Sequence, residues 1–130
     1  MKVAIISGGT KGIGKAVCQL LLTKGLKVYT SARSIDHNFT HPNLFQFAAD
    51  LSTKKGVIQF AKYVKAKENV IDILVNNVGV FMPGKLMDEE EGCFEKQIDT
   101  NLASTYHLTR KTIDAIRPSK KPYIFNICST

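Results

Sequence analysis

The sequence lacks a long apolar run and a signal-peptide pattern. Its uninterrupted apolar stretches, such as residues 3–6 and 20–22, are only a few residues long. A membrane-spanning helix needs roughly 20 apolar residues, and a secretory leader needs a charged start, an apolar stretch and a cleavage site of small residues. We therefore expect a cytoplasmic protein that does not insert into a membrane.

Cysteine is also scarce. The chain contains Cys18, Cys93 and Cys128, an odd number with no C-x-x-C spacing and no His at ligand spacing. This argues against a disulfide-stabilised scaffold and a zinc site, and it predicts reduced, partly buried thiols. The acidic run of residues 88–91 also makes a poor metal site, because consecutive helical residues point in different directions. We expect no metal site.

The charge is unbalanced but dispersed. Eighteen Lys and Arg residues against 11 Asp and Glu residues give a formal net charge of +7. Such a charge suits either nucleic acid or a small ligand that carries phosphate. The lysines are spread along the whole chain, which is typical of a solvated surface, and we therefore expect no nucleic-acid partner. With 130 residues and no repeat or linker, the chain is predicted to form a single domain, residues 1–130.

Short apolar runs alternate with segments of helical periodicity. The predicted strands are residues 3–7, 28–32, 44–48, 71–75 and 123–128. Runs that are apolar throughout are typical of parallel strands covered on both faces. The alternation predicts an α/β fold with a doubly wound parallel sheet, similar to a Rossmann domain.

Three helices are predicted between these strands. The first follows a glycine cluster and ends before Gly25, the second is capped by Thr53, and the third occupies much of residues 89–116. The spacing of apolar residues predicts which side chains face the core. In chain order these are Ile13, Ala16, Val17, Leu20, Leu21, Val57, Phe60, Ala61, Val64, Ile98, Leu102, Ile113 and Ile116.

The first strand runs directly into a glycine-rich turn. Residues 7–14 read Ser-Gly-Gly-Thr-Lys-Gly-Ile-Gly, in which Gly8, Gly12 and Gly14 form G-x-x-x-G-x-G. Glycines permit a sharp turn, close approach of the backbone to a pyrophosphate and close packing of the helix on the sheet. The helix start supplies free N–H groups and a partial positive charge. This predicts a dinucleotide site made by Gly8, Gly9, Thr10, Lys11, Gly12, Ile13 and Gly14.

Together with three further motifs, this turn resembles the short-chain dehydrogenase/reductase family, in its N-terminal, cofactor-binding half. Residues 76–79, Asn-Asn-Val-Gly, resemble the family's N-N-A-G motif after the fourth strand, with Val78 in place of Ala. Residues 99–102 resemble the segment with the catalytic Asn, and residues 126–129 resemble N-I-S-S. The resemblance implies cofactor contacts from Asp50, Leu51, Asn76, Asn77, Val78 and Gly79, and catalytic roles for Asn101 and Ser129.

The end of the second strand bears on the choice of cofactor. An acid there, roughly 20 residues after the glycines, would bind the ribose 2′-OH of NAD. Ala32 stands in that position and Arg33 follows it. With no carboxylate to repel it, a 2′-phosphate could bind between Arg33 and Lys11, which predicts NADP rather than NAD. The alternative is that both are solvated surface cations.

The resemblance implies an NADP-dependent oxidoreductase that transfers hydride between nicotinamide and a carbonyl or hydroxyl carbon. The candidate substrates are a 3-oxoacyl thioester and a simple ketone, and the family pattern implies a homodimer or homotetramer. The alternatives are a non-catalytic regulatory protein that binds NAD(P) and a nucleic-acid binder.

The family also needs a Tyr and a Lys spaced Y-x-x-x-K, one helical turn apart. Tyr63 and Lys67 have that spacing but precede residues 76–79, so we do not expect them to be catalytic.

The expected Tyr and Lys would lie beyond Thr130, together with the family's C-terminal strands. We therefore expect the sequence to be the N-terminal part of a longer chain, inactive by itself. The alternative is a truncated protein that binds nucleotide without turnover. In either case residues 123–128 would form an apolar edge strand with unpaired N–H and C=O groups. We expect the 130-residue chain to be poorly soluble or to cover this edge by self-association.

Overall fold

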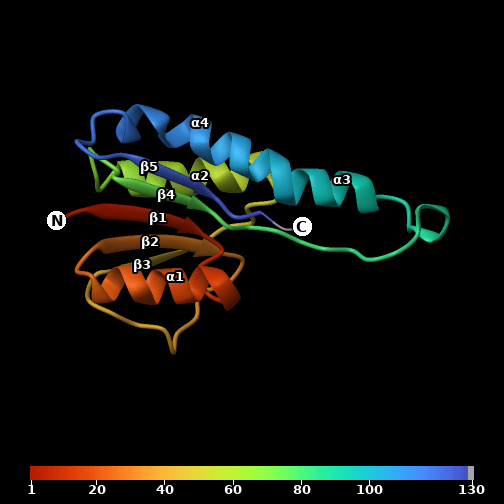
Figure 1. Cartoon of the computed structure of the whole chain (residues 1–130), viewed down its shortest axis with the longest axis horizontal. Helices are drawn as coiled ribbons and strands as arrows, with labels where there is room; N and C mark the ends of the chain where they lie inside the picture. Colours follow the sequence, from red (N-terminus) through yellow and green to blue (C-terminus); the bar gives the residue numbers. More distant parts are fainter. Residues whose placement is uncertain (129–130) are drawn as a thin grey trace.

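A parallel five-stranded sheet forms the centre of the computed structural model, which describes residues 1–128. Its strands are β1 (Val3–Ser7), β2 (Lys27–Ala32), β3 (Leu44–Ala48), β4 (Ile73–Asn76) and β5 (Tyr123–Asn126). They lie in the order β3-β2-β1-β4-β5, with every pair parallel (Figure 1). The chain first extends the sheet on one side of β1 and then on the other. This confirms the predicted doubly wound α/β fold.

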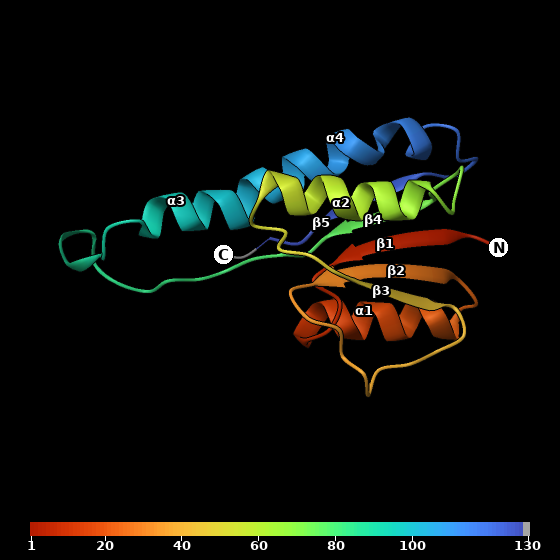
Figure 2. The same cartoon turned by 180° about the vertical axis from the view of Figure 1, so that it is seen from behind.

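Helices cover both faces of the sheet. Helix α1 (Gly12–Thr23) packs on one face, and α2 (Lys54–Lys65) and α4 (Ser104–Ile116) lie side by side on the other (Figures 1 and 2). Successive residues of β1 point into different cores, as the pleat of a strand requires. Ala4 and Ile6 join the core beneath α1, whereas Val3 and Ile5 join the core beneath α2 and α4.

The buried face of α1 differs from the predicted one. Gly14, Cys18 and Leu22 are the buried residues of this helix. Ile13 and Leu20 are 62% and 55% exposed, and Ala16 is exposed as well, so the prediction was wrong for these three residues. The helix uses a glycine and a cysteine at the centre of its contact, because these small residues let it approach the sheet closely. A prediction that considers only large apolar residues therefore overlooks buried positions occupied by glycine or cysteine.

Helix α2 agrees with its predicted cap and stripe. The hydroxyl of Thr53 accepts a hydrogen bond from the backbone N–H of Gly56 at 3.0 Å. The side chains of the four predicted residues are buried: Val57, Phe60, Ala61 and Val64. Here the large apolar residues are those that face the core, so the periodicity alone identified the correct face.

The third predicted helical region is three elements. These are α3 (Cys93–Ile98), a π-helical turn (Asp99–Ala103) and α4, so helix begins at Cys93, after the acidic run. Ile98 and Leu102 are 39% and 60% exposed, against prediction, while Ile116 is buried as expected. The buried face instead carries small hydroxyl side chains. Ser104 and Thr112 can be buried because their hydroxyls donate to carbonyl oxygens one turn earlier.

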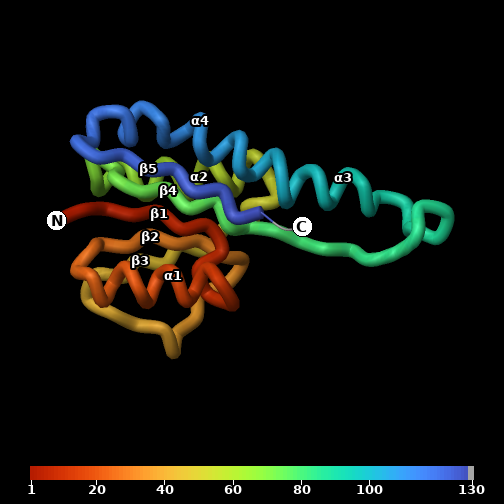
Figure 3. Tube along the Cα trace, in the orientation of Figure 1, coloured from red at the N-terminus to blue at the C-terminus, as the bar shows by residue number. Residues whose placement is uncertain are grey.

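Residues 80–98 form an arm that projects from the sheet (Figures 1 and 3). The arm contains a short 3₁₀ helix, η1 (Leu86–Asp88), and α3. Three of its apolar side chains are almost fully exposed, namely Phe81, Leu86 and Met87. Across residues 1–128, no helix is both long and apolar enough to cross a membrane.

Strand β5 is exposed on both faces. Tyr123, Ile124 and Phe125 each keep 40–48% of their accessible surface. Of the strands in the described part of the chain, β5 pairs with β4 alone. This is the apolar edge that the sequence predicted.

Candidate functional site

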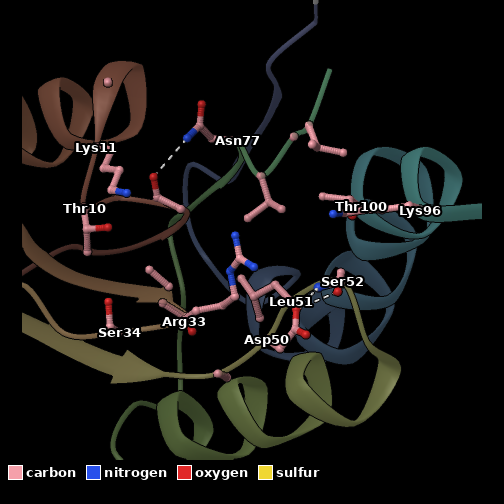
Figure 4. Close-up of a pocket in the computed structure, with 18 residues that line it drawn as sticks. Thr10, Lys11, Arg33, Ser34, Asp50, Leu51, Ser52, Asn77, Lys96 and Thr100 are labelled. Atoms are coloured by element: carbon pink, nitrogen blue, oxygen red, sulfur yellow. Dashed lines mark hydrogen bonds between the residues drawn. The ribbon is translucent and has the colours of Figure 1, made fainter. Parts of the chain in front are cut away.

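A pocket of about 470 Å³ opens at the carboxyl ends of the strands (Figure 4). It lies between the ends of β2, β1 and β4, where the direction of chain progression reverses. Ligands of open α/β sheets bind at such a reversal. The pocket is lined by Gly8, Thr10, Lys11, Gly12, Ser31, Ala32, Arg33, Ser34, Ala49, Asp50, Leu51, Ser52, Asn77, Val78, Gly79, Val80, Lys96 and Thr100.

The glycine turn connects β1 to α1 beside this pocket. Gly8 has a φ of +71°, a conformation that L side chains rarely adopt. A Cβ atom on Gly9 would clash with the Thr30 hydroxyl, and one on Gly14 would clash with the carbonyl oxygen of Gly8. Gly9 also donates its N–H to that hydroxyl at 2.8 Å. Three glycines therefore shape the turn, and two of them do so by close packing.

The start of α1 faces the pocket without a side chain in the way. Lys11 is the N-cap residue and makes no side-chain capping bond, and the first turn has no acidic residue. A Cβ on Gly12 would have no heavy atom within 4 Å, so the space in front of it is open. The first N–H groups of a helix have no intrahelical acceptor. This end of α1 is therefore suited to an anion such as a pyrophosphate.

The polar groups of the pocket also favour an anionic ligand with hydrogen-bonding groups. Lys11, Arg33 and Lys96 line it. None of the three belongs to an ion pair within residues 1–128. The hydroxyl of Ser31 is buried and finds no hydrogen-bond partner among the same residues. These residues fit a nicotinamide dinucleotide, which carries phosphates, hydroxyls and a base.

Asp50 is the carboxylate of the pocket. Its Oδ1 accepts hydrogen bonds from the Ser52 hydroxyl at 2.6 Å and from the Ser52 N–H at 3.0 Å. These bonds lower the pKa of Asp50, and the charge of Arg33 contributes further. Asp50 is therefore ionised at neutral pH and keeps Oδ2 free of hydrogen bonds within the described chain.

Residues 76–79 connect the end of β4 to the glycine turn. The Ser7 hydroxyl accepts the N–H groups of Asn77 at 2.9 Å and Val78 at 3.1 Å. The side chain of Asn77 donates to the Gly8 carbonyl at 3.2 Å (Figure 4). Asn76 points elsewhere, since its amide donates to Asn126 at 3.0 Å. Asn77 therefore holds the turn, whereas Asn76 connects β4 to β5.

Most of the predicted cofactor residues come together in this pocket, although four do not line it. The ones outside the lining are Gly9, Ile13, Gly14 and Asn76. Gly9 and Gly14 pack behind the turn, and Ile13 is exposed. Sequence reasoning missed Lys96 and Thr100. Lys96 comes from the projecting α3, which none of the sequence motifs covers. Thr100 lies in the π-helical turn, inside the motif of residues 99–102, from which only Asn101 was singled out.

Of the two predicted catalytic residues, Asn101 is described by the structure and Ser129 is not. The side chain of Asn101, in the π-helical turn, accepts the N–H of Val80 at 2.6 Å and donates to its carbonyl at 2.8 Å. Ser129 lies outside the described residues. Tyr63 stacks on Phe47 in the core beneath α2, with ring centroids 4.7 Å apart, and Lys67 lies over its ring. Tyr63 is not among the described residues that line the pocket.

A family model and the curated relatives both match this chain to dehydrogenases and reductases. The family model described as short chain dehydrogenase matches residues 2–130. The 3-oxoacyl-[acyl-carrier-protein] reductase FabG of Buchnera aphidicola is 28% identical over 98% of this chain and 54% of its own length. The chain therefore spans about half the length of such curated relatives.

Solved structures match the fold closely. The aldohexose dehydrogenase of Thermoplasma acidophilum superposes with a TM-score of 0.89 at 26% identity, over 98% of this chain and 49% of that one. The RhlG/NADP active-site complex of Pseudomonas aeruginosa superposes with a TM-score of 0.87 at 26% identity, over 98% and 54%. Since the family model covers nearly the whole sequence, this chain belongs to the short-chain dehydrogenase family.

Proposed function

We propose that this chain is the cofactor-binding part of an NADP-dependent oxidoreductase that transfers hydride between nicotinamide and a carbonyl or hydroxyl carbon. The observation that carries the proposal is the open glycine turn at the start of α1, which borders a pocket lined by three cations that form no ion pair within residues 1–128. The bound nicotinamide would supply or accept the hydride. The protein would bind the cofactor, orient it and handle the proton.

Each wall of the pocket has a role in this proposal. The N–H groups at the start of α1 bind the pyrophosphate. Asp50 accepts a hydrogen bond from the adenine amino group, and Leu51 packs against the base. Residues 77–79 lie under the rest of the dinucleotide. These roles agree with the resemblance and with the place of each residue in the pocket lining.

Arg33 and Lys11 are proposed to bind the 2′-phosphate that distinguishes NADP from NAD. Both line the pocket, and Ala32 leaves no carboxylate at the position that would select NAD. A guanidinium group binds a phosphate through two parallel hydrogen bonds. Structural relatives solved with NADP, including RhlG and ElxO, are consistent with this preference.

Calorimetric titration of the natural polypeptide with NADPH and NADH tests the proposal. We expect NADPH to bind at least about tenfold more tightly, since charge-assisted hydrogen bonds contribute roughly 1.5–3 kcal/mol. Arg33→Asp should weaken NADPH binding and favour NADH, because the new carboxylate repels the 2′-phosphate. Arg117→Asp, at an exposed residue outside the pocket lining, is the matched control. Equal or tighter binding of NADH by the unmodified chain would overturn the NADP preference.

Asn101 and Ser129 are the proposed catalytic residues. By resemblance, the Ser hydroxyl polarises the carbonyl oxygen of the substrate, and the Asn holds a water that relays the proton. Val80 already engages both polar atoms of the Asn101 side chain. A water held by this residue would therefore bind its backbone, and the side chain would fix the position of that backbone.

The substrate and the assembly are proposed from the relatives. A 3-oxoacyl thioester is the first candidate because FabG reductases are among the curated relatives at 28% identity. A simple ketone is the second. We propose a homodimer or homotetramer, a cytoplasmic location, and no nucleic-acid partner, and we propose residues 1–130 as one domain.

A non-catalytic protein that senses NAD(P) is the second candidate function. It is favoured by one observation, that no tyrosine lines the pocket within residues 1–128. The two candidates differ in turnover, which is followed as loss of NADPH absorbance with a 3-oxoacyl thioester or a ketone. For the enzyme this assay needs the natural polypeptide with any Y-x-x-x-K segment it carries. Tight NADPH binding by that polypeptide without turnover would favour the sensor.

A further inference from the structure

Lys96 reaches the pocket from an element that none of the sequence motifs covers. It belongs to α3, in the projecting arm, and lines the pocket opposite Arg33 (Figure 4). Thr100 lines the same wall and lies one helical turn later, on the same side of the helix. The wall formed by Lys96 and Thr100 therefore closes the side of the pocket that faces the arm.

The charge of Lys96 is available to a ligand. The described part of the chain contains three ion pairs, and Lys96 is in none of them. Its side chain also makes none of the hydrogen bonds found among residues 1–128, and its backbone N–H donates to Gly92 at 3.0 Å. An exposed ammonium group without a partner costs little desolvation when an acceptor approaches it.

The position of Lys96 points to one end of the cofactor. The π-helical turn that follows α3 lies against the segment after β3, because Asp99 and Ala103 share a second hollow of about 260 Å³ with Leu51 and Ser52. That segment is the one assigned to adenine in the proposed function. Lys96 and Thr100 thus lie on the adenine side, away from the start of α1.

We infer that Lys96 is a further cofactor-binding residue, which contacts the adenosine end of the dinucleotide from α3. The acceptors available to its ammonium group there are the ring nitrogens of adenine and the oxygens of the ribose and its 2′-phosphate. This inference rests on the proposed binding of NADP. It adds that the projecting arm takes part in holding the cofactor.

The position of the arm depends on a second contact. Two hydrogen bonds connect Val80, the first residue of the arm, to Asn101, in the π-helical turn that follows the arm. Val80 lines the pocket as well. A cofactor that contacts Lys96 would therefore connect α3 to the body of the protein from the pocket side, in addition to the connection made by Asn101.

Binding of NADPH and of 2′,5′-ADP to Lys96→Gln tests the inference, with this variant and its controls made in the natural polypeptide. The second ligand contains the adenosine end and lacks nicotinamide. We expect both to bind about 3- to 10-fold more weakly than to the unmodified chain, as for loss of one exposed charged contact. The difference should shrink at high salt, where exposed charges are screened. Lys96→Arg should restore binding.

Lys85→Gln is the matched control, since Lys85 is an exposed lysine of the same arm that does not line the pocket. It should bind both ligands as the unmodified chain does. Lys96→Gln should not change the thermal unfolding temperature without ligand, because this side chain makes no hydrogen bond or ion pair with any residue that the structure describes. Unchanged affinity of Lys96→Gln for both ligands would overturn the inference. A loss confined to NADPH would place Lys96 at the nicotinamide end and would also overturn it.

The outcomes separate this inference from the proposed function. If the unmodified chain binds neither NADPH nor 2′,5′-ADP, the proposed function fails and the inference fails with it. If it binds both and Lys96→Gln binds them equally well, the inference alone fails.

Discussion

Glycines near the turn are required at some positions because a Cβ atom there would clash with neighbouring segments. Gly14 has an ordinary backbone conformation, yet a Cβ would meet the backbone of Gly8 and the side chain of Asn77. The turn and the end of β4 therefore come together only because this position carries no side chain. The need for glycine at Gly14 is one of packing, whereas at Gly8 it is one of backbone conformation.

Gly14→Ala should destabilise the protein by about 1–3 kcal/mol, because backbone atoms cannot move aside as a flexible side chain can. The measurement is the free energy of urea unfolding. Gly79→Ala is a milder comparison, since its Cβ would meet a side-chain oxygen, that of Asn101, at 3.3 Å. Equal unfolding free energies for Gly14→Ala and the unmodified chain would contradict the packing argument.

The cysteines differ in burial and therefore in reactivity. Cys18 and Cys93 are buried, and Cys128 is exposed. Burial raises the pKa of the Cys18 thiol to about 11, so the reactive thiolate is scarce at pH 8. We expect a thiol reagent such as DTNB to label Cys128 rapidly in the folded protein, and Cys18 and Cys93 only on unfolding.

Cys128→Ser should remove the rapid labelling phase and leave the slow one unchanged. Rapid labelling of Cys18 would contradict the burial described here. The sequence predicted all three thiols to be partly buried. The tertiary structure shows instead that Cys18 and Cys93 are buried and Cys128 is exposed.

At the scale of elements, α1 and α2 both have a helical pattern of apolar residues. The pattern identified the buried face of α2 correctly but not that of α1. The stripe of α2 consists of large apolar residues, and its cap Thr53 is a residue type with a known capping role. The contact face of α1 centres on Gly14 and Cys18, which a pattern of large residues does not reveal. Two of the large apolar residues of α1, Ile13 and Leu20, are exposed to solvent, whereas Leu22 is buried.

Thr53→Ala should destabilise the fold by about 1 kcal/mol, because it removes the hydrogen bond to the N–H of Gly56. Chemical denaturation measures the change. Thr23→Ala is the matched control. The Thr23 hydroxyl donates to the Gln19 carbonyl at the exposed end of α1 and caps no N–H group. We expect Thr23→Ala to change stability by less than about 0.5 kcal/mol; a larger effect than that of Thr53→Ala would contradict the capping role.

The π-helical turn is the element least accessible to sequence reasoning. A continuous helix over residues 89–116 predicts Ile98 and Leu102 on the inner face. The wider turn at Asp99–Ala103 changes the phase between α3 and α4, and the inner face passes to Thr100 and Ser104. Thr100, which lines the pocket, lies in this turn, so the error in the helix face and the failure to predict Thr100 arise in the same element.

At the scale of the whole molecule, exposed apolar surface gathers at two places. One is β5, where Tyr123, Ile124 and Phe125 are 40–48% exposed beside an edge that pairs with no other strand of the described residues. The other is the arm and the outer face of the helices behind it, including Tyr106 at 59% exposure. An apolar edge strand is a template for pairing with another chain.

We therefore expect the 130-residue chain to self-associate or to aggregate, as measured by analytical ultracentrifugation. Ile124→Lys should raise the fraction of monomer, because a charge on an edge strand opposes pairing. Tyr106→Lys tests association through the helix face instead. A stable, monodisperse monomer of the unmodified chain would falsify the prediction, and a monomer produced by Tyr106→Lys alone would move the interface to the helices.

The sequence by itself determined the order of elements, the parallel sheet and the glycine turn. These follow from local patterns, since apolar runs, helical spacing and glycines report on the backbone next to them. The family motifs added Asp50 and residues 77–79, which the fold brings to the same edge as the turn.

Only the tertiary structure decided which face of α1 is buried, where the long helical region widens, and that Lys96 joins the pocket. Those outcomes depend on contacts between segments far apart in the sequence. Gly14 against Gly8 and Asn77, and Asn101 against Val80, are such contacts. Their free energy depends on the fit between surfaces, and a local pattern along one segment carries no information about the shape of the other.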